Sequence, residues 1–232
     1  MSLSALRIGG LTALTSIDYP GELAAVVFCQ GCPWRCRYCH NSHLLAKRGA
    51  NQIPGSQVRA FLESRRGLLD AVVFSGGEPS LQRGLAGAMA EVKALGFKVG
   101  LHTAGCFPDR LRPLIADLDW VGLDIKGLEE DYGSITGVPD SGRRAWECLE
   151  VLLESDVALE VRTTLLPHWS FERHLTPLAE RLAALGVRHY VLQACNTTLS
   201  LDPQLRQPPY PWALTPAQRA ELAARFSHFS ER

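Results

Sequence analysis

The chain has no net charge, no membrane-length apolar run and no secretion signal, and each absence excludes a class of function. Its 24 lysines and arginines balance 24 aspartates and glutamates, so overall charge gives no reason to expect binding to nucleic acid or an anionic membrane. No apolar run approaches the roughly 20 residues of a membrane span. Residues 1–10 lack a signal peptide's apolar core and cleavage site. We therefore expect a cytoplasmic protein with no membrane and no nucleic-acid partner.

The sequence also lacks low-complexity segments and linkers, which indicates a single domain spanning residues 1–232. A domain of this size buries roughly 70% of its unfolded-chain surface, so it needs no disulfides to fold. The odd number of cysteines, seven, also argues against complete pairing. No glycine-rich dinucleotide fingerprint follows the first predicted strand, which argues against a Rossmann fold.

What the sequence does contain is an alternation of apolar runs and amphipathic segments, typical of an α/β protein. Strands are predicted at residues 23–28, 69–74, 97–102, 120–125, 158–165 and 190–193. Helices are predicted at residues 57–66, 82–95, 109–118, 141–154, 171–185 and 216–226. A strand or hairpin precedes this core of about residues 22–195, and a tail, residues 196–232, starts proline-rich and ends in a helix.

This alternation predicts a parallel sheet with right-handed crossovers. Two closures remain open at this point: an open doubly wound sheet, or a partial β/α barrel. In both, the carboxyl ends of the strands meet at one edge, where α/β proteins carry their chemistry.

The densest chemical signal is a cysteine loop just after the first core strand. Four of the seven cysteines lie within residues 29–39, and in a reducing compartment such clusters are ligands more often than disulfides. Cys32, Cys36 and Cys39 follow a C-x3-C-x2-C spacing. Zinc sites favour two separated cysteine pairs, whereas a 4Fe–4S cluster held by three thiolates leaves one iron open for a substrate. Cys29 is either a fourth ligand or a small buried residue that ends the strand.

The spacing resembles the signature of the radical S-adenosylmethionine superfamily, in which an aromatic residue, here Tyr38, precedes the last cysteine. The resemblance implies a partial (β/α)6 barrel and metal ligands Cys32, Cys36 and Cys39. It also implies that the open iron of the 4Fe–4S cluster chelates the amino and carboxylate groups of S-adenosylmethionine. Reductive cleavage of that cofactor yields methionine and a 5′-deoxyadenosyl radical, which abstracts a hydrogen atom. By this resemblance Cys29 is not a ligand.

A second motif follows the next strand. Gly76, Gly77 and Glu78 resemble the family's glycine-glycine-glutamate motif, which receives the cofactor's amino group. Glycines allow backbone to approach a ligand closely, and a carboxylate pairs with an ammonium. On its own, the same sequence could be an ordinary turn.

Further candidates follow the later strands. Thr103 matches the glycyl-radical-activating branch, but His102 stands where that branch has an acid. Asp124 and Lys126 resemble its Asp-Leu/Ile-Lys motif and point the same way from a strand end, although they could also form only a local salt bridge.

The fifth predicted strand carries Arg162, which matches the branch's strand arginine, since a buried guanidinium needs an anionic or polar partner. His168 is a further candidate for the cofactor site, although a lone histidine is more often structural.

The N-terminal block, from Gly10 to Gly21, together with Cys39-His40-Asn41, closely resembles anaerobic ribonucleoside-triphosphate reductase activating proteins. The resemblance implies an oxidoreductase that installs a glycyl radical on a partner enzyme, with electrons from a flavodoxin or ferredoxin. Two alternatives remain: a radical S-adenosylmethionine enzyme acting on a small molecule or RNA, and a zinc-binding interaction module.

Overall fold

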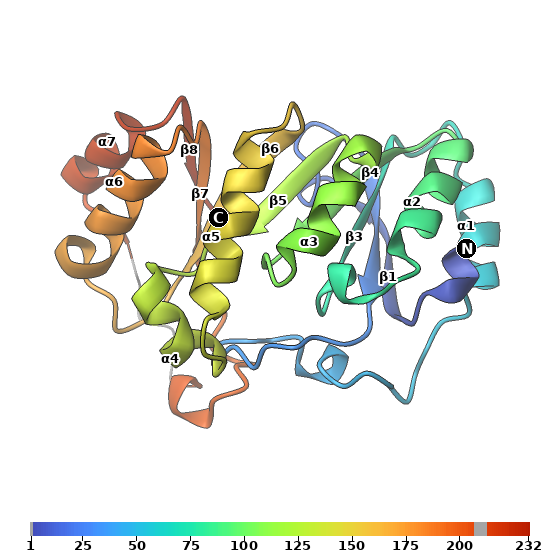
Figure 1. The fold of residues 1–232 in the computed structure, drawn as a ribbon, viewed down its shortest axis with the longest axis horizontal. Helices are drawn as coiled ribbons and strands as arrows, with labels where there is room; N and C mark the ends of the chain where they lie inside the picture. The colour runs from blue at the N-terminus through green and yellow to red at the C-terminus, as the bar shows by residue number, and fades with distance from the viewer. Residues whose placement is uncertain (1, 207–212) are drawn as a thin grey trace.

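The computed structural model describes residues 2–206 and 213–232. Its centre is one sheet whose spatial order follows the chain (Figure 1). The strands are β1 (Ile8–Thr15), β2 (Ala24–Cys29), β3 (Ala71–Gly76), β4 (Lys98–Thr103), β5 (Trp120–Asp124), β6 (Ala158–Leu165), β7 (His189–Ala194) and β8 (His228–Glu231). β1 pairs with β2 in antiparallel fashion, and every later pair is parallel.

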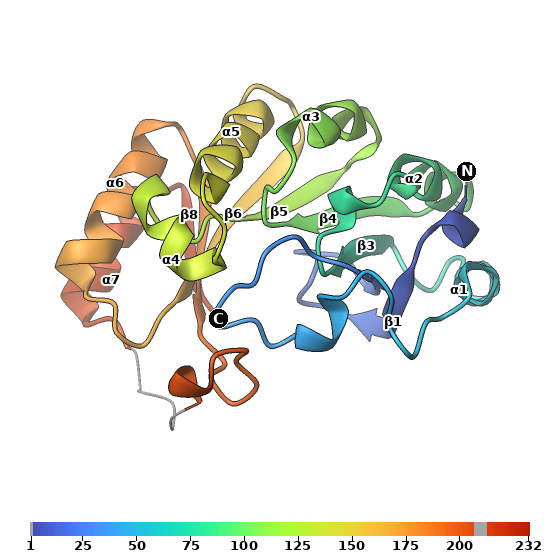
Figure 2. The same cartoon turned by 60° about the horizontal axis from the view of Figure 1, so that its bottom comes forward.

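Helices connect the parallel strands and cover one side of the sheet. They are α1 (Gly55–Glu63), α2 (Leu85–Ala94), α3 (Pro108–Leu111), α4 (Tyr132–Thr136), α5 (Ser141–Leu153), α6 (Thr176–Ala184) and α7 (Pro216–Ala223). Figure 2 shows α2, α3, α5 and α6 on the outside of a curved sheet that does not close on itself. The predicted α/β class and partial barrel are therefore confirmed. Among the described residues, no helix combines the length and apolar character needed to cross a bilayer.

The continuous apolar runs of the strands arise because both faces of the sheet are covered. On the outer face, Val72 and Phe74 are fully buried in the main core beneath the helices. On the inner face, Val26 and Val73 belong to a small cluster with Tyr19 and Trp120, whose rings lie 5.1 Å apart. A strand with apolar neighbours on both sides shows no alternation, which is the pattern of a buried parallel strand.

The tail differs from the prediction in one respect. Its predicted helix is present as α7, but the chain then continues into β8, which pairs with β7 and adds a further parallel strand. β8 has only four residues, too short for a hydrophobic period to be recognised. The proline-rich residues 207–212 of the tail lie outside the described residues.

Two helices also differ from the prediction. The helix predicted at residues 109–118 is a single α-helical turn followed by a 3-10 segment, Arg112–Asp117, that contains Pro113 near its start. α4 was not predicted, because a five-residue helix is too short to show a periodic pattern.

Leu222 tests whether the tail belongs to the cooperative core. It is fully buried on α7, so Leu222→Ala should lower the free energy of unfolding by about 2–5 kcal/mol in urea denaturation. Leu14, 60% exposed on β1, is the matched control, and its truncation should change stability by no more than about 0.5 kcal/mol. Equal effects of the two substitutions would show that the tail folds separately.

Candidate active site

The carboxyl ends of β2 to β7 open into a cleft of about 350 Å³. It is formed by the cysteine loop on one side and by strand ends on the other. The predicted site residues on its lining are Cys32, Cys36, Tyr38, Cys39, Gly76, Gly77, Thr103, Asp124, Lys126 and Arg162. Parallel strands with consecutive order bring these distant residues to one edge, as the strand-end rule predicts.

The cysteine loop is held against the barrel by its backbone. The amide of Cys32 donates to the carbonyl of Leu45 at 3.1 Å, and the amide of Arg37 donates to the carbonyl of Ile135 at 3.0 Å. These bonds fix the loop from two sides. As a result, all three thiols of the C-x3-C-x2-C motif face the cleft.

The three thiols differ in acidity. The Cys106 thiol donates toward Cys32 and lowers the pKa of Cys32, against the opposing effects of burial and Glu78. Burial raises the pKa of Cys36 to about 11, although nearby Lys126 opposes the shift. Burial also raises the pKa of Cys39. Metal binding at this loop must therefore release protons, since the ligand form is the thiolate.

Cys29 lies apart from the cleft. Its side chain is fully buried in the main core, and burial raises the pKa of its thiol to about 12. This placement supports the reading of Cys29 as a small core residue rather than a ligand.

Among the described residues, no three His, Cys, Asp or Glu side chains are arranged around a single metal ion. Ligands of one zinc ion all lie about 2.3 Å from one point. In a cubane cluster each thiolate binds a different iron, so its thiolates are spaced more widely.

The glycine pair after β3 makes room for the cysteine loop. A Cβ on Gly77 would lie 2.3 Å from the carbonyl oxygen of Gly31, and Gly76 has a positive φ of 109°. The amide of Gly77 donates to the carbonyl of Cys29, and the amide of Glu78 donates to that of Gly31, both at 2.8 Å. The sequence predicted that these glycines allow backbone to approach a ligand closely. In the structure, the group that approaches them is the backbone of the cysteine loop.

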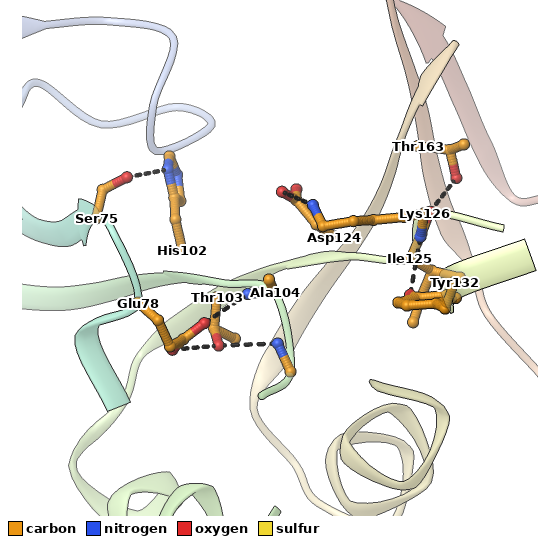
Figure 3. Close-up of polar contacts among 11 residues, drawn as sticks. Ser75, Glu78, His102, Thr103, Ala104, Asp124, Ile125, Lys126, Tyr132 and Thr163 are labelled. Atoms are coloured by element: carbon orange, nitrogen blue, oxygen red, sulfur yellow. Dashed lines mark hydrogen bonds and ion pairs between the residues drawn. The ribbon is translucent and has the colours of Figure 1, made fainter. Parts of the chain in front are cut away.

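Glu78 is completely buried and is not on the cleft lining. One carboxylate oxygen accepts hydrogen bonds from the amide and hydroxyl of Ser80 and from the hydroxyl of Thr103, and the other accepts from the amide of Ala104. Figure 3 shows the bonds to Thr103 and Ala104. Both oxygens are therefore occupied by groups of the chain. Glu78 ties the end of β3 to the end of β4, a role the sequence did not reveal.

Asp124 and Lys126 form an ion pair at the end of β5, with Nζ 3.1 Å from Oδ2 (Figure 3). The Lys126 ammonium also lies 5.4 Å from the centre of the Tyr38 ring. Burial alone would lower the pKa of Lys126, but Asp124 and neighbouring groups raise it well above its usual range. Burial would raise the pKa of Asp124, but Lys126 and Arg162 outweigh it and lower that pKa. Both groups are charged at neutral pH.

His102 is a neutral member of the site. Its Nδ1 lies 3.3 Å from the Ser75 hydroxyl (Figure 3), and its Nε2 lies 2.8 Å from the carbonyl oxygen of Asp18 and 3.1 Å from Nη1 of Arg162. Burial, followed by the charge of Arg162, lowers the pKa of His102 to about 4. Where the related branch has an acid, this chain therefore places an uncharged ring.

Arg162 is a buried cation with one unused donor. Its Nε donates to Glu160 at 2.7 Å, and its guanidinium lies over the Trp120 ring at 5.0 Å. Its Nη2 is buried with no hydrogen-bond partner among the described residues, although the side chain lines the cleft. An unpaired buried donor of this kind favours an anionic or polar ligand.

His168 is the one predicted residue that the structure places in another cavity. It is exposed and lines a smaller pocket with Arg37, Trp169 and His174. We therefore remove His168 from the candidate site.

Some lining residues were not predicted from the sequence: Asp18, Trp34, Asn41, Ser75, Thr164 and Asn196. Asp18 lies in the N-terminal block from Gly10 to Gly21, which was noted only for its resemblance to ribonucleotide reductase activators. Thr164 and Asn196 carry no distinctive spacing, so only the strand-end rule could have suggested them.

Comparison with known proteins identifies the family to which this arrangement belongs. Residues 26–176 match the model of the Radical SAM superfamily, in which SAM is S-adenosylmethionine. The chain belongs to the radical SAM superfamily. Its relatives lie in the glycyl-radical-activating branch, and its cofactors are those of the family, a 4Fe–4S cluster and S-adenosylmethionine.

Two relatives and one solved structure illustrate the match. The chain is 28% identical over 213 residues to a candidate glycyl-radical enzyme activating enzyme of Methanocaldococcus jannaschii, covering 88% of this chain and 86% of the relative. It is 30% identical over 168 residues to the pyruvate formate-lyase-activating enzyme of Clostridium pasteurianum, covering 69% of each. SuiB of Streptococcus suis superimposes with a TM-score of 0.65 at 12% identity, over 89% of this chain and 48% of SuiB. The chain thus spans about half of SuiB, and that likeness shows the fold alone.

The radical SAM cofactors suit the donors present in the cleft. Three thiols face the cavity, which matches a cluster with one open iron. The charged pair of Asp124 and Lys126, with the unused donor of Arg162, offers opposite charges to an amino-acid group that carries both an ammonium and a carboxylate.

The cysteine assignment predicts a clear split among single variants. Anaerobically reconstituted wild-type protein should contain about four irons per chain, and Cys32→Ala, Cys36→Ala and Cys39→Ala should each lose the cluster. Cys29→Ala, the matched control, should retain it, because Cys29 lies in the core rather than on the cleft. Loss of iron in Cys29→Ala with retention in any of the other three would refute the assignment.

His102 predicts a specific loss of stability in acid. Because its pKa is about 4 in the folded protein against 6.5 when unperturbed, the unfolded chain binds the proton more tightly. The stabilisation is complete above pH 6.5 and is lost as pH falls toward 4, by about 3 kcal/mol. Urea unfolding at several pH values should show this loss in the wild type and in the exposed-site control His43→Gln. His102→Gln should lack it, and identical pH profiles for all three would contradict the account.

Proposed function

We propose that this radical SAM enzyme installs a glycyl radical on a partner enzyme, and that the partner is an anaerobic ribonucleoside-triphosphate reductase. When bound, the reduced cluster and S-adenosylmethionine supply methionine and a 5′-deoxyadenosyl radical, which takes a hydrogen atom from a glycine Cα. The observation that carries the proposal is the joint presence, on one cleft, of three motif thiols and a charged strand-end set.

The residues divide the work of holding these groups. Cys32, Cys36 and Cys39 would bind three irons of the cluster and leave the fourth open toward the strand ends. Asp124, whose side chain is 39% exposed, would face the cofactor's ammonium, whereas Lys126 and Arg162 would face its carboxylate or ribose.

The remaining residues of the site would hold other groups in place. Glu78 is fully buried off the cleft lining and accepts hydrogen bonds at both oxygens, so it would hold the strand ends in place rather than touch the cofactor. Gly76 and Gly77 would keep the loop close to β3, and Thr103 would fix Glu78 from β4. Tyr38 would support the Lys126 ammonium from beneath.

A protein substrate suits the far end of the cleft. Thr164 on β6 lies opposite Gln193 on β7 in the sheet register, and both line the cleft. Neither side chain has a hydrogen-bond partner within the described residues. Uncharged polar groups of this kind match a glycine, which offers only main-chain donors and acceptors to a recognition site.

The choice of partner rests on the N-terminal block that resembles ribonucleotide reductase activators. The relatives' names instead include pyruvate formate-lyase, so that enzyme is the competing partner. We also propose a flavodoxin or ferredoxin as electron donor. A reducing cytoplasm suits the seven free cysteines.

The test uses reconstituted protein, dithionite and S-adenosylmethionine under anaerobic conditions, with anaerobic ribonucleotide reductase or pyruvate formate-lyase as substrate. We expect 5′-deoxyadenosine in chromatography and a glycyl-radical doublet in electron paramagnetic resonance (EPR) only with the reductase. A doublet only with pyruvate formate-lyase would replace the partner and keep the activity. Formation of 5′-deoxyadenosine with neither partner radicalised would favour a small-molecule or RNA substrate. Absence of cofactor cleavage, with one tightly bound zinc per chain, would refute the proposal.

A further inference from the structure

The segment that carries the cysteine loop is strongly basic, although the whole chain is neutral. From residue 23 to residue 62 there is no aspartate or glutamate. The same stretch contains Arg35, Arg37, Lys47, Arg48 and Arg59. A one-signed stretch of this length in a chain of zero net charge concentrates positive potential at one place on the surface.

Three of these cations lie beside the cluster ligands. The guanidinium of Arg35 donates to the carbonyl of Cys32 at 2.9 Å. The Lys47–Arg48 pair follows Leu45, whose carbonyl accepts from the amide of Cys32. We call Arg35, Lys47 and Arg48 the basic loop surface. Figure 2 shows this loop crossing the side of the sheet that the helices leave uncovered.

The segment around Lys47 and Arg48 is held in place rather than free to move its charges away. The side-chain amide of Gln30, buried at the end of β2, donates to the carbonyls of His43 at 3.0 Å and Ala46 at 2.7 Å. These bonds fix the backbone on both sides of Leu45. The backbone that carries Lys47 and Arg48 is therefore held close to the segment that contains Cys32.

The charges of the basic loop surface are not neutralised within the described part of the chain. Lys47 and Arg48 are exposed and make no ion pair there, and Arg35 bonds only to backbone carbonyls. The other two cations are different. Arg37 pairs with Asp202 at 2.8 Å, and Arg59 pairs with two glutamates, so neither belongs to the surface.

The basic loop surface is also outside the cleft. None of Arg35, Lys47 and Arg48 lines the cavity that would hold the cofactor, so these cations are not placed to bind the cofactor's carboxylate. A glycine substrate, by contrast, must enter through the cleft. These cations therefore suit a partner other than the cofactor and the glycine substrate.

We propose that the basic loop surface docks a small acidic one-electron carrier protein. This inference rests on the proposed function, because the cluster must be reduced before the cofactor is cleaved. In the step served by docking, the carrier loses one electron and the cluster gains one, passing from the 2+ to the 1+ state. Electron transfer slows steeply with distance, so docking beside Cys32 gives a short route that leaves the cleft free for the substrate.

The test compares two charge reversals of the same size. Lys47→Glu/Arg48→Glu reverses the basic loop surface, whereas Arg65→Glu/Arg66→Glu reverses two exposed arginines just before β3, at the opposite end of the strands. Each variant is titrated with an acidic flavodoxin by calorimetry. Each is also assayed for 5′-deoxyadenosine with reduced flavodoxin and, separately, with dithionite.

We expect the first variant to bind flavodoxin about tenfold more weakly at low salt, with a matching loss of flavodoxin-driven turnover. The deficit should shrink as salt rises. Dithionite-driven turnover should match the wild type, and the Arg65/Arg66 variant should match it in every assay.

Unchanged flavodoxin affinity in the first variant would overturn the inference. So would an equal loss with dithionite, or a loss confined to glycyl-radical formation, which would assign the surface to the partner enzyme. If wild type fails to cleave the cofactor with dithionite, the proposed function fails, and the titration still decides the docking.

Discussion

The site depends on a backbone contact between the cysteine loop and the end of β3. Gly77 and Glu78 donate their amides to the carbonyls of Cys29 and Gly31, and a Cβ at Gly77 would clash with the Gly31 oxygen. Only glycine permits this approach. The contact holds the cysteine loop against the sheet, so the three thiols share one cavity with the charged residues of the strands. A site held by backbone hydrogen bonds to a packed sheet is already organised before any ligand arrives.

The buried charged groups of the cleft lower the stability of the fold unless a bound ligand pairs with them. Glu160 and Arg162 are buried together, yet Arg162 retains a donor with no partner among the described residues. Leaving a charged donor unsatisfied costs more than an average hydrogen bond gains. The protein spends fold stability on groups that an ammonium and a carboxylate would satisfy. Neutral His102 beside Arg162 adds no further positive charge to a cleft that already contains Lys126 and Arg162.

The sequence predicted site residues where chemically distinctive residues follow the strands. It did not predict the role of a side chain where burial determines that role. The thiols, Asp124 and Lys126 were predicted because a motif and a strand end coincided at each, whereas Arg162 was predicted from its match to the branch's arginine within a strand. Glu78 was expected on the cleft, but its burial under four hydrogen bonds could be seen only in three dimensions. His168 was expected on the cleft from its place just after a strand, but it lines a separate pocket with Arg37, Trp169 and His174. β8 was missed because four residues carry no readable period.

The central claim is that the cluster has one open iron that binds the amino-acid group of S-adenosylmethionine beside Lys126 and Arg162. The most direct measurement is electron–nuclear double resonance on the reduced, reconstituted protein, with cofactor carrying 17O in its carboxylate and 15N in its amino group. The account predicts hyperfine coupling of both labels to the reduced cluster. A reduced cluster whose spectrum shows no coupling to either label would contradict it.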